Sequence, residues 1–193
     1  KRHDVICFHV DSKLVRCEGL DWLAQKKGVG RRVKELTELS MNGAVPMEKV
    51  FTKKLDILAP SKSEMVLVGE YYCQNLTENA YEVIHALQSL GKTVWLITGS
   101  FAPAIEPLAR QLNIPLQHVL TNTIYFDDEG NYVRIDINNC LTRADGKSIH
   151  VKTIAEGKCV AFIGDSVTDL ATKPFVKTFI GYGGVALREK VKD

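Results

Sequence analysis

The stretch "VICFHVDSKLV" at residues 5–15 decides the fold of this chain. It begins as a short continuous apolar run and passes directly into the polar residues His9, Asp11, Ser12 and Lys13. A run of this length and composition predicts a strand buried on both faces, as in parallel sheets. Ligands of such sheets bind where the strands end, so the residues that follow this strand are the first candidates for a site.

Similar apolar runs alternate with helical periods along the rest of the chain. The predicted strands are residues 5–10, 93–98, 118–122, 159–164 and 178–183. In the segments between them, apolar residues recur every three or four positions, and the predicted helices are 79–91, 101–114 and 145–157. Strands that alternate with helices predict right-handed crossovers and a doubly wound α/β sheet with a parallel, Rossmann-like core.

Two segments interrupt this alternation. Residues 16–75 carry several helical patterns and no convincing strand, which indicates a helical cap inserted after the first strand of a core formed by 1–15 and 76–193. In residues 123–136, two apolar arms flank the turn at 128–130, which predicts a β-hairpin. The cap aromatics Trp22, Tyr71 and Tyr72 are expected to serve packing.

Composition narrows the classes of function. The formal net charge of +2 and the scattered lysines and arginines argue against a nucleic acid or membrane partner. Five cysteines without metal-type spacing indicate reduced thiols and a cytoplasmic protein. No apolar run approaches the length of a membrane span, and the chain enters its first strand at once, so no signal peptide is expected.

Polar residues that suit phosphate chemistry follow several predicted strands. They are Asp11 and Ser12 after the first strand, Thr98, Gly99 and Ser100 after the second, Asp165 and Asp169 after the fourth, and Lys147 at the start of a helix. Hydroxyls and N–H groups at a helix N-terminus suit a phosphate, which a lysine neutralises. Clustered carboxylates usually need a hard cation such as Mg²⁺. The order of these groups predicts a phosphate site at the carboxyl edge of the sheet.

The chain resembles the haloacid dehalogenase superfamily and, within it, the phosphoserine phosphatase family. The motifs that carry the resemblance are "VICFHVDSKLVRCEGLDWLA", "SMNGAVPMEKVFTKKL", "LITGSF", "ADGK", "FIGDSVTD", and "FIGYGG" with "VKD". The resemblance implies hydrolysis of a small phosphorylated metabolite through an aspartyl-phosphate, with Mg²⁺ as cofactor and a place in serine biosynthesis.

The resemblance also implies a role for each matching residue. Asp11 is the general acid/base, and Ser12, Thr98, Gly99, Ser100 and Lys147 belong to the phosphate and substrate site. The metal ligands are Asp11 through its backbone carbonyl, Asp165, and Asp169 through water. Glu18 meets the substrate amine, and Lys54 stands where an arginine for the substrate carboxylate is expected.

Three residues depart from the pattern of the family. The nucleophilic aspartate falls on His9, a threonine falls on Lys13, and the cap arginine falls on Lys54. Imidazole is a poor ligand for a hard cation, and lysine lacks the bidentate fork of arginine. The family site combines four carboxylates, one lysine and Mg²⁺, and three carboxylates with two lysines give the same net charge here. Lys13 is therefore expected to reach toward Asp11 and Asp165 and to take over part of the role of the cation, so that Mg²⁺ binding is lost.

Three hypotheses follow from these departures. The first is a phosphatase-like protein with impaired hydrolysis that retains binding of a phosphometabolite, of free phosphate or of a protein partner. The second is a variant of an active Mg²⁺-dependent phosphomonoester hydrolase. The third is an active phosphatase in which His9 is a phosphohistidine nucleophile, with Asp11 as the acid.

Overall fold

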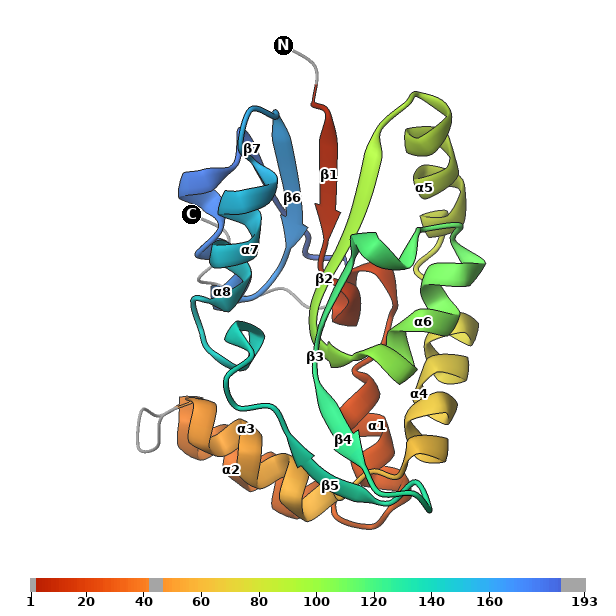
Figure 1. Cartoon of the computed structure of the whole chain (residues 1–193), viewed down its shortest axis with the longest axis vertical. Helices are drawn as coiled ribbons and strands as arrows, with labels where there is room; N and C mark the ends of the chain where they lie inside the picture. Colours follow the sequence, from red (N-terminus) through yellow and green to blue (C-terminus); the bar gives the residue numbers. More distant parts are fainter. Residues whose placement is uncertain (1–2, 42–46, 185–193) are drawn as a thin grey trace.

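The computed structural model describes residues 3–41 and 47–184 (Figure 1). A five-stranded parallel sheet forms its centre, in the order β3-β2-β1-β6-β7. The strands are β1 (Val5–Phe8), β2 (Thr93–Phe101), β3 (Val119–Asn122), β6 (Val160–Gly164) and β7 (Thr178–Gly181). Val5 pairs with Thr93 on one side and with Val160 on the other. The predicted α/β fold class is confirmed, and all five predicted strands are present.

Helices cover both faces of the sheet. The helices of the core are α5 (Ala80–Ser89), α6 (Ala102–Gln111), α7 (Gly146–Ile154) and α8 (Val167–Leu170). Figure 1 shows α5 and α6 on one side of the sheet and α7 and α8 on the other. Side chains of a strand alternate between its faces, so Leu96 packs into the cluster beneath α5 and α6, and Ile97 packs into the cluster beneath α7.

The segment between β1 and β2 is helical, as the sequence predicts. It contains α1 (Gly19–Lys26), α2 (Gly30–Met41), α3 (Met47–Leu58) and α4 (Lys62–Gln74). Figure 1 shows α1, α2 and α3 beyond the carboxyl ends of the strands, whereas α4 lies alongside α6. The approach of α4 to α6 is close, because a Cβ at Gly69 would lie 2.9 Å from the carbonyl oxygen of Ala104.

The predicted hairpin is also present. Strands β4 (Ile124–Phe126) and β5 (Tyr132–Ile135) pair antiparallel. The hairpin reaches the cap, because β5 contacts α3 and the Tyr132 hydroxyl donates to Asp56 Oδ1 at 3.0 Å. Short 3-10 helices occupy Leu116–His118, Cys140–Thr142 and Lys173–Phe175. In the described part of the chain, no helix has both the length and the apolar character needed to cross a bilayer.

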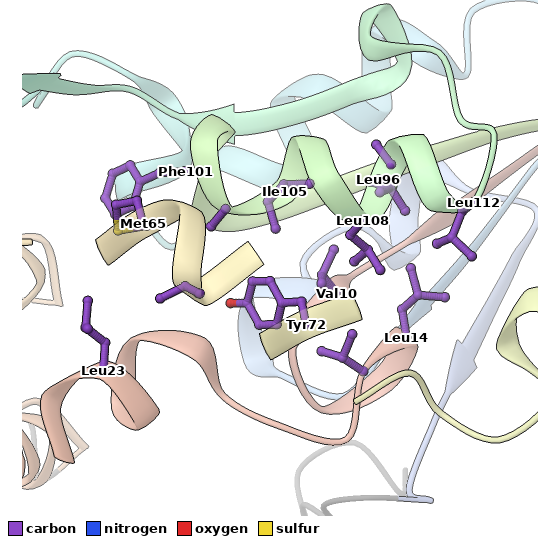
Figure 2. Packing of buried hydrophobic residues seen from close by; sticks show 14 of the residues in the cluster. Val10, Leu14, Leu23, Met65, Tyr72, Leu96, Phe101, Ile105, Leu108 and Leu112 are labelled. Atoms are coloured by element: carbon purple, nitrogen blue, oxygen red, sulfur yellow. The ribbon is translucent and has the colours of Figure 1, made fainter. Parts of the chain in front are cut away.

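The turn after β1 is anchored in the larger apolar cluster. The predicted strand 5–10 ends at Phe8, and residues Val10–Leu14 form a tight turn in which Ser12 has a positive φ of 59°. Val10 and Leu14 are buried with Tyr72 of α4, as Figure 2 shows. Because these apolar side chains are fixed in the core, the polar residues between them have defined positions at the edge of the sheet.

Candidate active site

The carboxylate of Asp11 is held by three donors from separate parts of the chain. Its Oδ1 accepts from the backbone N–H of Gly19 at 3.1 Å and from the Tyr72 hydroxyl at 2.6 Å. Its Oδ2 lies 3.5 Å from Thr98 Oγ1, a longer contact. Donors of this kind fix the orientation of the carboxylate.

Two lysines pair with the two buried carboxylates of the last acidic motif. The Lys13 ammonium contacts Asp165 Oδ1 directly and lies 3.8 Å from Asp169 Oδ2. The Lys147 ammonium lies 2.5 Å from Asp169 Oδ1. All four side chains are at most 7% exposed, so water screens these pairs weakly. The ammonium of Lys13 was expected at Asp11 and Asp165, and the structure brings it to Asp165 and Asp169.

The protonation of this cluster follows from burial and from the neighbouring charges. Burial lowers the pKa of Lys13 to about 8, although Asp169 acts in the opposite direction. Burial would raise the pKa of Asp169, but His9 and Lys147 hold it well below its usual range. At neutral pH the Asp169 carboxylate is therefore ionised and the Lys13 ammonium group is largely charged.

His9 is neutral and has one defined tautomer. Burial lowers its pKa to about 4, against the effect of Asp169. Its Nδ1 lies 2.8 Å from Asp169 Oδ2, and an ionised carboxylate only accepts hydrogen bonds. We therefore assign the proton to Nδ1, which leaves a lone pair on Nε2.

The turn after β6 presents Asp169 to these groups. Oδ2 of Asp169 accepts from the backbone N–H groups of Asp165 and Ser166, each at 3.0 Å. The turn requires glycine at position 164, because a Cβ there would lie 2.4 Å from the Cβ of Asp169. Asp169 thus has donors on both oxygens before any ligand is considered.

A hard divalent cation does not fit this arrangement. His9, Asp165 and Asp169 each offer an atom within 4.8 Å of the others, which is close enough for a shared ion. However, the ammonium groups of Lys13 and Lys147 already contact one oxygen of each carboxylate. Mg²⁺ prefers an octahedral shell of oxygen ligands and several waters. The Lys13 ammonium group would therefore compete with such an ion for Asp165 Oδ1.

A pocket of about 370 Å³ opens between this cluster and the cap. Its polar lining consists, among the described residues, of His9, Asp11, Glu18, Asp21, Lys54, Tyr72 and Ser100, together with Gly99. The apolar residues that face it are Leu20, Val33, Phe51, Leu55 and Leu58. Glu18 is fixed by a hydrogen bond of 2.6 Å from Ser12 Oγ. Thr98, Lys13, Lys147, Asp165 and Asp169 are buried outside this lining.

The structure thus brings the predicted residues to one end of the sheet, where some of them line the pocket and others form a buried cluster. His9, Asp11, Glu18, Lys54 and Ser100 reach the pocket, and the lysine–carboxylate cluster is buried elsewhere at that end. The closing motif "VKD" lies outside the described residues. The individual roles that the resemblance implies stay predictions.

Sequence reasoning missed two residues of the site. Tyr72 is fully buried, as a packing residue would be, yet its hydroxyl also donates to Asp11. Met65, Val68 and Tyr72 follow helical spacing, a pattern that indicates packing alone. Asp21 lies at the start of α1 and lines the pocket; it falls within the first quoted motif, but sequence reasoning gave it no role.

Comparison with known proteins agrees with this geometry. Residues 10–172 match the haloacid dehalogenase-like hydrolase family. Phosphoserine phosphatase of Homo sapiens is 35% identical over 193 residues, with 98% of this chain and 86% of the relative covered. This chain belongs to the phosphoserine phosphatase family. The resemblance drawn from the motifs is confirmed.

Other members of the family show the same extent of similarity. Phosphoserine phosphatase of Drosophila melanogaster is 33% identical over 195 residues, covering 99% of this chain and 72% of the relative. The crystal structure of a phosphoserine phosphohydrolase-like protein from Francisella tularensis superposes with a TM-score of 0.82 at 27% identity, covering 98% of this chain and 91% of that chain. The similarity to these proteins therefore extends over nearly the whole of this chain.

Proposed function

We propose that this member of the phosphoserine phosphatase family binds a small phosphomonoester or free phosphate and has lost most or all of the hydrolysis. The observation that carries the proposal is the contact between Lys13 and Asp165. An ammonium group at that oxygen supplies positive charge where the family reaction needs a divalent cation. It cannot act as a Lewis acid that coordinates and polarises a phosphate oxygen, as a metal ion does. We infer that Mg²⁺ binding is lost with it.

The missing nucleophile supports the same proposal. His9 has no carboxylate with which to form an aspartyl-phosphate, and its Nδ1–H is engaged by Asp169. Asp11 retains its donors from Gly19 and Tyr72, so the general acid/base position stays ordered without the partner on which it would act.

Anion binding is supported by groups that the substitutions leave in place. Gly99 and Ser100 line the pocket at the point where β2 leads into α6. The N-terminus of a helix favours an anion through its free N–H groups and its dipole. The ammonium groups of Lys13 and Lys147 lie at the same end of the sheet and partly offset the charge of Asp165 and Asp169.

Calorimetry without metal tests this proposal. Inorganic phosphate is expected to bind, and Lys147→Met is expected to weaken it by roughly tenfold or more, since a neutral side chain leaves Asp169 uncompensated. Lys152→Met is the matched control, because Lys152 is an exposed residue of the same helix. Thermal melting checks that both variants are folded. Absence of phosphate binding in the unmodified protein, or equal binding by the two variants, would overturn the proposal.

A phosphohistidine mechanism is the second candidate, and the tautomer of His9 favours it. His9 lines the pocket with Nε2 as its available lone pair. Nε2 would attack phosphorus, the alcohol would leave with a proton, and water would then cleave the P–N bond to regenerate imidazole. Turnover by the unmodified protein that His9→Ala abolishes, together with an acid-labile phosphoryl adduct in the mass spectrum, would establish this route in place of the first.

The third alternative is an active Mg²⁺-dependent hydrolase. It requires Lys13 to leave Asp165 when the cation binds, which would separate a buried ion pair. Phosphate release that rises with added Mg²⁺ in the unmodified protein would support it. We expect release at background level with and without Mg²⁺.

A further inference from the structure

The charges on the pocket wall are mostly negative. Asp11, Glu18 and Asp21 line the pocket, and within the described part of the chain Lys54 is the only lysine or arginine that does so. Lys13 and Lys147 do not line it, and both are paired with buried carboxylates. A ligand in this pocket therefore meets three carboxylates and one ammonium group directly.

Lys54 is a poor partner for a ligand carboxylate. Burial lowers its pKa, and among the neighbouring charges Asp21 acts on it most strongly and Glu18 next. A carboxylate that approached Lys54 would also approach these two acids, so much of the attraction would be cancelled. A lysine also offers a point charge rather than the bidentate fork that holds a carboxylate well.

Glu18, in contrast, favours a cation. Burial raises its pKa and Asp11 raises it further, against the hydrogen bond from Ser12 and the charge of Lys13. Ser12 Oγ donates to Glu18 Oε1 at 2.6 Å, which fixes the carboxylate beside the pocket. A ligand ammonium group would relieve the repulsion between Glu18 and Asp11.

Among the described residues, the part of the wall that the cap contributes beside Glu18, Asp21 and Lys54 is apolar. It is formed by Leu20 of α1, Val33 of α2, and Phe51, Leu55 and Leu58 of α3. A carboxylate directed at these side chains would lose hydration without a hydrogen bond in return. The methylene groups of an amino alcohol would lose nothing there.

We propose that the pocket selects phosphomonoesters whose alcohol part carries an amine and no carboxylate, as in phosphoethanolamine, over the phosphorylated amino acid. Asp21 is the residue to which we assign this preference, because its carboxylate lines the pocket together with Lys54. The inference rests on the proposed function, since it takes this pocket as the phosphomonoester site.

Four small phosphomonoesters separate the contributions of the two groups. Phosphoethanolamine carries the amine alone, phosphoserine carries both groups, phosphoglycolate carries the carboxylate alone, and ethyl phosphate carries neither. In metal-free calorimetry, phosphoethanolamine is expected to bind roughly tenfold tighter than phosphoserine, and phosphoglycolate weakest of the four. Inorganic phosphate is measured in the same series.

Two variants assign the preference to its residue. Asp21→Asn is expected to strengthen phosphoserine binding several-fold relative to phosphoethanolamine, because the Asp21 carboxylate then no longer repels the carboxylate of the ligand. Glu48→Gln is the matched control, since it removes one negative charge from an exposed position of the same cap outside the pocket lining. The control is expected to leave the ratio unchanged.

The outcomes distinguish this inference from the proposed function. If inorganic phosphate binds but phosphoserine binds as tightly as phosphoethanolamine, the proposed selectivity is wrong. The proposal of a phosphate site would still stand. If Asp21→Asn does not change the ratio of the phosphoethanolamine and phosphoserine affinities, or if Glu48→Gln changes it equally, Asp21 is not the cause of the preference. Failure of phosphate and of all four esters to bind overturns both.

Discussion

The ammonium of Lys13 lies against Asp165, and the two residues are 152 positions apart in the chain. Lys13 belongs to the turn after β1, and Asp165 follows β6, its parallel neighbour. This contact gives the site a cation of its own. It also makes the Lys13 side chain a direct competitor of any divalent ion for the same oxygen.

Restoring the family residues at both positions is expected to restore the reaction. His9→Asp alone should recover little activity, because Lys13 would still hold Asp165. His9→Asp with Lys13→Thr is expected to give Mg²⁺-dependent release of phosphate from a small phosphomonoester. The measurement is phosphate release with and without Mg²⁺, and His9→Asp with Lys158→Thr is the control, because Lys158 is exposed. Full rescue by His9→Asp alone would show that Lys13 does not block the cation.

The same contact predicts an effect on stability. Lys13→Met should lower the free energy of unfolding by about 3–5 kcal/mol, because it removes the ammonium group that contacts the buried carboxylate of Asp165. Added Mg²⁺ should recover part of this loss in Lys13→Met but leave the unmodified protein unchanged. Urea unfolding with and without Mg²⁺ measures both effects. Equal stabilisation of the two proteins by Mg²⁺ would contradict the prediction.

The hydroxyl of Tyr72 is expected to stabilise the fold through Asp11. Tyr72→Phe keeps the packing of the ring and removes the donor at 2.6 Å. The loss should be about 1.5–3 kcal/mol, the range for hydrogen bonds to charged groups. Tyr71→Phe is the matched control, since Tyr71 instead stacks on Trp22 with ring centroids 4.3 Å apart. Similar unfolding free energies for both variants in urea would argue against the Asp11 contact.

The start of α4 predicts a dependence of stability on pH. Glu64 is partly buried, which would raise its pKa, but hydrogen bonds from Lys27 and from the Ser61 backbone lower it below the usual value. A lowered pKa means that Glu64 stabilises the fold above its unfolded pKa of about 4.3 and that this contribution is lost as the pH falls through the folded pKa.

Glu64→Gln therefore should cost about 0.5–1 kcal/mol at pH 7, and the difference from the unmodified protein should shrink toward pH 3. Urea unfolding at several pH values measures this change. Glu70→Gln, on an exposed position of the same helix, should show no such trend. A loss for Glu64→Gln that stays constant down to pH 3 would contradict the assignment.

The sequence alone determined the strands and the edge of the sheet at which the site lies. Short apolar runs such as "VICF" and "VAFIG", each bounded by polar or turn residues, predict strands buried on both faces, and the carboxyl ends of such strands meet when they pair in parallel. Asp11 and Asp165 were therefore predictable as neighbours. The hairpin at 123–136 was predictable for a similar reason, since its alternation and its turn are local.

Only the tertiary structure decided which groups contact one another within that edge. The donation from Tyr72 to Asp11 depends on how α4 packs along α6, and the position of Asp21 beside the pocket depends on how α1 lies in the cap. Helical spacing shows that a residue faces apolar neighbours but not which neighbours they are. The pairing of Lys13 with Asp165 and Asp169 likewise follows from burial, because a buried ammonium group must lie against the carboxylates that the packing places within its reach.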